Sequence, residues 1–145
     1  MAKLQIMLLG CGKMGSAMLK GWLADTSLDA QFTIIEPFAD HLDWVRAHQQ
    51  VAVYHDCEAA ISAEAPVNSV IVLAVKPQMM DEAIAAFGPL RDDKTAFLTI
   101  AAGISTAWLK ARLGADAPVL RAMPNTPAAI GRGVTALYCD SAAAD

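Results

Sequence analysis

Residues 4–15 join a short apolar run to three closely spaced glycines, and they read Leu4-Gln5-Ile6-Met7-Leu8-Leu9-Gly10-Cys11-Gly12-Lys13-Met14-Gly15. A G-x-G-x-x-G pattern between a strand and a helix is typical of the turn that holds a dinucleotide diphosphate. In that turn, Gly10 permits the tight bend, Gly12 lets the backbone approach the diphosphate, and Gly15 lets the helix pack on the strand. The start of the helix adds free N–H groups and a partial positive charge. We therefore predict cofactor contacts from residues 10–15, with a purely structural glycine turn as the alternative.

Strand-like apolar runs alternate with helical periodicity along nearly the whole chain. After the first strand, the sequence predicts strands at residues 32–35, 51–54, 70–75, 96–100, 119–123 and 134–138. Helical patterns begin near Met14, Leu42, Pro77 and Thr106. Because residues 70–75 are continuously apolar, that strand should be buried on both faces of a parallel sheet. The prediction is an α/β fold of the doubly wound, Rossmann-like type, mostly parallel, with helices on both faces and one domain over residues 1–145.

The composition of the chain argues against several classes of function. Hydrophobic residues make up 55% and charged residues 18%, and the formal net charge is -4. Because no basic run could replace the counterions of a nucleic acid, we expect no nucleic-acid partner. No run reaches the roughly 18 apolar residues of a membrane helix, so we expect no membrane insertion. The apolar surplus fits a sheet covered on both faces and a surface covered by another domain or subunit.

The cysteines and histidines suggest neither a disulfide framework nor a metal site. The three cysteines lie far apart and form no C-x-x-C pair, which favours a reducing compartment, by default the cytoplasm. His41, His48 and His55 recur every seven residues, but no acidic or cysteine ligand keeps the same spacing. We interpret them as surface histidines and predict no metal.

Glu36 ends the second predicted strand, about 20 residues after the glycine turn, where this type of fold carries an acidic residue. A carboxylate there accepts hydrogen bonds from the ribose hydroxyls of NAD and repels the extra phosphate of NADP. Residues 37–40 offer no arginine or lysine to hold that phosphate. Among the two cofactors, NADPH or NADH, Glu36 therefore favours NADH. The alternative is a solvated charge at a strand end.

Three further segments follow predicted strands at the carboxyl edge of the sheet, where ligands bind in open α/β folds. They are Ala74-Val75-Lys76-Pro77, Ala101-Ala102-Gly103 and Met123-Pro124-Asn125-Thr126. The first is expected to border the nicotinamide ribose, and the second to let the nicotinamide ring lie close to the backbone. Lys76 could donate a proton, but we prefer a solvent-facing lysine whose backbone matters more. The third segment, fixed by prolines, is expected to form one wall of the substrate side, with a structural turn as an equal alternative.

With these motifs, the chain resembles 1-pyrroline-5-carboxylate reductase, an oxidoreductase family of proline biosynthesis. The resemblance covers essentially the whole chain and is most specific in Arg121-Ala122-Met123-Pro124-Asn125-Thr126-Pro127. It implies hydride transfer from a reduced nicotinamide to the carbon of a small cyclic imine, which yields L-proline. In such chemistry the protein mainly holds imine and cofactor within reach of each other. The resemblance assigns no catalytic residue.

The chain also departs from that family. Family members commonly favour NADPH and carry a small or basic residue where this chain has Glu36. Where the family often has an asparagine near the adenine ribose, this chain has Asp56, which we include among the expected cofactor contacts. Family members continue into a helical C-terminal domain that forms the dimer and most of the substrate pocket. We find no counterpart of it here, so we expect an incomplete dinucleotide-binding domain, inactive and prone to associate when isolated, and a homo-oligomer, at least a dimer, for the full-length enzyme.

Two other interpretations stay open. A dehydrogenase of the 3-hydroxyacid or prephenate type would share the G-x-G-x-M-G start, whereas the segment Met123–Pro127 favours the imine reductase. A non-catalytic nucleotide-binding module is the second alternative.

Overall fold

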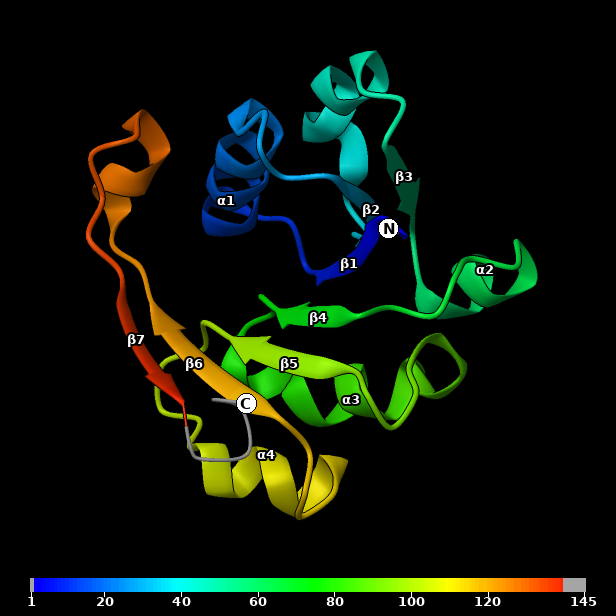
Figure 1. The fold of residues 1–145 in the computed structure, drawn as a ribbon, viewed down its shortest axis with the longest axis vertical. Coiled ribbons are helices and arrows are strands. Elements are labelled where there is room, and N and C mark those ends of the chain that lie inside the picture. The colour runs from blue at the N-terminus through cyan, green and yellow to red at the C-terminus, as the bar shows by residue number, and fades with distance from the viewer. Residues whose placement is uncertain (1, 140–145) are drawn as a thin grey trace.

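The computed structural model describes residues 2–139, and it contains a seven-stranded sheet flanked by helices (Figure 1). The strands are β1 (Leu4–Leu9), β2 (Ala30–Ile35), β3 (Val51–Tyr54), β4 (Val70–Leu73), β5 (Ala96–Thr99), β6 (Val119–Met123) and β7 (Ala136–Cys139). The α-helices are α1 (Lys13–Ala24), α2 (Cys57–Ser62), α3 (Met80–Ala86) and α4 (Thr106–Leu113). Short 3-10 helices are η1 (Ala39–Ala47), η2 (Pro77–Met79), η3 (Gly88–Leu90) and η4 (Thr126–Ile130).

The strand order in the sheet is β3-β2-β1-β4-β5-β6-β7. The first six strands are parallel, and β7 pairs antiparallel with β6 at the edge. The order reverses between β1 and β4, whose last residues Leu9 and Leu73 lie opposite each other. The predicted doubly wound, mostly parallel α/β fold is confirmed. In such a sheet, ligands bind beyond the carboxyl ends of the strands at this reversal point.

The two faces of the sheet are covered by different helices because successive side chains of a strand point to opposite faces. In β1, Ile6 and Leu8 pack into the core cluster with α1 and η1, whereas Met7 and Leu9 pack into the cluster with α2, α3 and α4. The middle strand β4 is buried on both faces, as its continuous apolar run predicts. Figure 1 shows α1 on one side of the sheet and α3 and α4 on the other.

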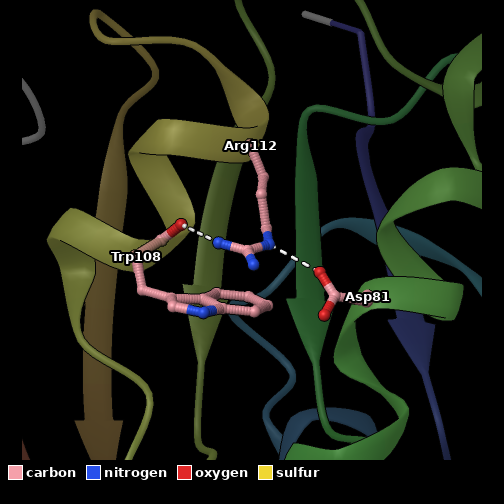
Figure 2. A network of polar contacts seen from close by, with 3 residues as sticks. All are labelled: Asp81, Trp108 and Arg112. Carbon is pink, nitrogen blue, oxygen red and sulfur yellow. Dashed lines mark hydrogen bonds and ion pairs between the residues drawn. The ribbon is translucent and has the colours of Figure 1, made fainter.

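Figure 2 shows how Arg112 of α4 ties this helix to α3. Its Nε donates to Oδ1 of Asp81 at 2.6 Å, and its guanidinium carbon lies 3.3 Å from the centre of the Trp108 ring. Asp81 is mostly exposed, so the ion pair itself contributes little, and the stacking on Trp108 contributes about 0.5–1 kcal/mol. The contact joins α4 to α3, which forms one wall of the cleft described below.

Several element boundaries differ from the sequence prediction. The helical pattern around Leu42 and Val45 forms the 3-10 helix η1, whose two apolar residues still reach the core. The strand predicted over residues 70–75 ends at Leu73, and Pro77 opens η2 before α3 begins at Met80. The helix α2 was not predicted.

The outer edge of the sheet carries an exposed apolar surface. Ile130, Val134, Leu137 and Tyr138 are exposed around η4 and β7. A surface of this kind favours association, so the predicted tendency to associate stays a prediction. Within residues 2–139, no helix has the length and hydropathy needed to cross a membrane.

Candidate functional site

The glycine turn has the local geometry that each glycine role requires. Gly10 has a φ of +87°, and a Cβ there would lie 2.9 Å from the carbonyl oxygen of Ala74. A Cβ at Gly15 would lie 2.9 Å from the carbonyl oxygen of Gly10, so α1 packs directly on the turn. A Cβ at Gly12 would meet nothing within 4 Å. The turn is therefore closed toward the protein at two glycines and open at the third, where α1 begins with no side-chain cap.

Cys11 lies inside the turn, and three side chains hold its peptide groups. Its N–H donates to Oε2 of Glu36 at 2.7 Å, and its carbonyl oxygen accepts the hydroxyl of Ser16 at 3.2 Å. Nε2 of His41 lies 2.6 Å from the same carbonyl oxygen. The side chain points into the core, where burial raises the pKa of the Cys11 thiol. Cys11 thus presents backbone rather than side chain to the turn.

Two strand-end carboxylates are already engaged in local hydrogen bonds. Besides the bond to the glycine turn, Glu36 accepts the N–H of Phe38 with Oε1 at 3.3 Å. Asp56 caps α2 by accepting the N–H of Ala59 at 2.7 Å, and its other oxygen lies 2.7 Å from Nε2 of His55. Both residues therefore shape the site in addition to any contact with a ligand.

A cleft of about 400 Å³ lies at the carboxyl ends of the central strands, bounded by α3. Seven predicted cofactor-binding residues line it, and they are Gly10, Gly12, Glu36, Asp56, Ala74, Val75 and Lys76. Phe38, His55, Met79 and Glu82 also line the cleft, although the sequence did not single them out. An aromatic residue two positions after the strand-end Glu36 is the sequence signal that could have found Phe38. His41 and His55 are exposed, as predicted for surface histidines, and each also contacts a residue of the site.

The remaining predicted residues lie outside this cleft. Lys13 and Met14 form the first turn of α1, and Pro77 is exposed at the start of η2. Ala101 is buried, whereas Ala102 and Gly103 are exposed beyond β5, Gly103 with a φ of +74°.

The segment after β6 has a clear structural role. Oδ1 of Asn125 accepts the N–H of Val134 at 2.9 Å and so closes the loop that leads through η4 to β7. The loop carries η4 alongside α1 (Figure 1). Met123 lines a second cavity, separate from the cleft. Pro124 is partly buried, and Thr126 begins η4 with its side chain outside the described part.

No metal-binding arrangement appears in the described part of the chain. Within residues 2–139, no three His, Cys, Asp or Glu side chains come together in a way that could hold an ion.

The fold and the glycine-turn cleft define a nucleotide-binding lobe of the oxidoreductase type, and comparison with known proteins agrees. The profile of the family described as NADP oxidoreductase, coenzyme F420-dependent, matches residues 5–103. The chain belongs to this family.

Comparison with individual proteins indicates a particular type of reductase. The pyrroline-5-carboxylate reductase of Pseudomonas aeruginosa is 33% identical over 138 residues, which cover 94% of this chain and 49% of that protein. A pyrroline-5-carboxylate reductase from Coxiella burnetii superposes with a TM-score of 0.81 at 26% identity, covering 97% of this chain and 51% of that one. The Plasmodium falciparum pyrroline carboxylate reductase with NADP bound gives a TM-score of 0.75 at 20% identity, over 97% and 50% of the two chains, and supports the fold alone. The predicted resemblance is confirmed, and the chain spans about half the length of these relatives.

The geometry of the turn predicts that substitution destabilises the protein at Gly10 but not at Gly12. Gly10→Ala should lower the free energy of unfolding by about 2 kcal/mol or more, because the new Cβ combines an unfavourable φ with a clash against Ala74. Gly12→Ser should change it by less than about 0.5 kcal/mol, because its Cβ points into open space and serine is a favourable N-cap. Urea unfolding of both variants measures the difference. Equal losses of stability would show that the turn does not approach β4 in this way.

Proposed function

We propose that this chain forms the nicotinamide-dinucleotide-binding half of a pyrroline-5-carboxylate reductase, the enzyme that reduces a cyclic imine to L-proline. The observation that carries the proposal is the identity of 33% with the Pseudomonas aeruginosa reductase over 94% of this chain. The site supports it independently, because residues 10–15, Glu36 and Ala74–Lys76 all border one edge of the sheet. We propose the reductase activity for the whole protein that contains this chain.

The residues that line the cleft are suited to bind a dinucleotide along its length. The open space at Gly12 and the uncapped start of α1 suit the diphosphate. Glu36 is at the right strand end for the adenine ribose, with Asp56 beside it. Phe38 and Met79 are exposed apolar residues in the cleft lining, and they offer contact surface for the adenine ring. The backbone of residues 74–76, and beyond it Ala101–Gly103, would border the nicotinamide end.

The chemistry expected at this site is hydride transfer, which the reduced nicotinamide supplies when bound. The contribution of this chain is to position the cofactor. The glycine turn, held by its hydrogen bonds, and the strand-end carboxylate provide that positioning. Pro124, Asn125 and Thr126 would form one wall of the imine site. Because Oδ1 of Asn125 already closes the loop to β7, its amide nitrogen is the group left for a substrate.

The remaining proposals concern assembly and location. We propose a homo-oligomer for the full-length enzyme, in keeping with the exposed apolar edge around η4 and β7. A cytoplasmic location agrees with three cysteines that are all free in the structure.

Cofactor binding should depend on the open space at Gly12. Gly12→Val should abolish NADH binding in calorimetric titration, because its side chain occupies the space that the diphosphate needs, while the protein stays folded. Gly21→Val is the control, since Gly21 lies within α1, the helix whose N-cap residue is Gly12, and also faces open space. Unchanged NADH affinity in a folded Gly12→Val protein would show that the diphosphate does not bind at this turn.

The cleft should prefer NADH to NADPH. Its lining contains Glu36, Asp56 and Glu82 but no arginine, and the lysine in the lining, Lys76, follows β4 at the nicotinamide end. The extra phosphate of NADPH, on the adenine ribose, therefore meets repulsion from Glu36 without a basic partner beside it. We expect a difference on the order of 1–3 kcal/mol in binding free energy. The double variant with Glu36→Ser and Pro37→Arg should reverse the order, whereas Glu58→Ser, on an exposed helical site, should not. Equal affinities in the parent would mean that Glu36 does not face the ribose.

Turnover should require the second half of the enzyme. The 145-residue chain should bind NADH but oxidise it negligibly with pyrroline-5-carboxylate, because it supplies only one wall of the imine site. A chimera in which this chain replaces the matching half of the Pseudomonas aeruginosa reductase should restore imine-dependent NADH oxidation. A folded chimera that binds NADH without turning over the imine would favour a different dehydrogenase or a non-catalytic nucleotide-binding module. Rapid turnover by the chain alone would show that the imine site is built elsewhere.

A further inference from the structure

A second cavity, of about 480 Å³, lies between the start of α4 and the β6–β7 edge of the sheet. It shares no lining residue with the cofactor cleft. Arg121 of β6 and Tyr138 of β7 lie opposite each other in the antiparallel pair and contribute polar groups to it. Met123 and Leu137 contribute apolar surface.

Arg121 is the unusual residue of this cavity. It is partly buried, and its Nε is shielded from solvent with no hydrogen-bond partner in the structure. Within residues 2–139 no carboxylate forms an ion pair with it, and no acidic residue lines the cavity. Arg91, which is also partly buried, differs because it donates to the carbonyl oxygen of Leu113 at 3.3 Å and lies over the ring of Phe97. A shielded Nε–H without an acceptor is costly, so the guanidinium of Arg121 calls for an anionic partner.

The surroundings restrict the chemistry of that partner. A guanidinium presents a planar fork of donors that matches a carboxylate. The hydroxyl of Ser105 accepts the N–H of Trp108 as the cap of α4, so it can still donate its O–H to a carboxylate in the cavity. A single cation beside Met123 and Leu137 suits one negative charge attached to a short hydrocarbon group, rather than a multiply charged phosphate.

We infer that this cavity binds the carboxylate of a small organic acid, with Arg121 as the anchor and Met123 and Leu137 around the hydrocarbon part. The inference stands on Arg121 and its cavity and does not rest on the proposed function. A carboxylate of this kind has two sources, a free small acid or an acidic side chain of a polypeptide, and the cavity walls favour the free acid.

The direct test follows the Nε–H signal of Arg121 by NMR in the isotope-labelled 145-residue chain. The signal is assigned by its loss in Arg121→Gln. Sodium propionate should shift it saturably, whereas n-propanol, which has the same hydrocarbon chain without the charge, should leave it unchanged. L-Proline should shift it as propionate does. No shift with either acid, or an equal shift with propanol, would overturn the inference.

Variants separate the anchor from general charge effects. Arg121→Lys should weaken propionate binding by about tenfold, because it keeps the charge but loses the planar fork. Arg121→Gln should abolish binding, and Arg46→Gln, which removes a charge from an exposed site, should leave it unchanged. An Arg121 signal that shifts with protein concentration, together with a dimer that disappears in Arg121→Gln, would assign the cavity to a polypeptide carboxylate and overturn the free-acid proposal.

Discussion

The close approach of the Gly10 turn to the end of β4 is the constraint on which the rest of the site depends. β1 and β4 pair in parallel at the centre of the sheet, so Leu9 and Leu73 end at the same edge. The chain leaving β1 must then turn within van der Waals reach of the Ala74 carbonyl, which leaves no room for a Cβ at Gly10. The start of α1 and the backbone of residues 74–76 therefore reach the same cleft. This shared edge is where we propose that the dinucleotide lies.

The peptide groups of Cys11 show how the turn is held once it is made. Glu36 binds the N–H, while Ser16 and His41 bind the carbonyl oxygen, so the residue after β2 and residues of α1 and η1 converge on one residue of the loop. This bonding fixes the turn before any ligand arrives, which lowers the ordering cost of binding. It also means that the carboxylate of Glu36 supports the turn in addition to making the ribose contact that we propose. Its effect on cofactor preference therefore includes its effect on the shape of the loop.

The sequence predicted the sheet and the glycine turn well because both depend on local patterns. The alternation of apolar runs and helices predicts the parallel strands, and the continuous apolar stretch of β4 predicts its central place. The hydrogen bonds that exposed residues make to distant parts of the chain were harder to predict. The bond of His41 to Cys11 joins residues far apart in the sequence, and no spacing rule reveals it. Likewise, Val134 lies outside β7 because its N–H bonds to the side chain of Asn125, which only the folded loop discloses. The missing acceptor of Arg121 is also visible only after folding.

The central claim is that one dinucleotide lies along the carboxyl edge of the sheet, with its diphosphate at the glycine turn and its adenosine beside β2 and β3. Mapping of backbone amide shifts during an NADH titration tests this claim most directly. The largest changes should fall on residues 10–15, on Glu36 to Phe38 and around Asp56, with small changes in α4 and β7. Changes concentrated around Arg121 and Tyr138, with none at Gly12, would contradict it.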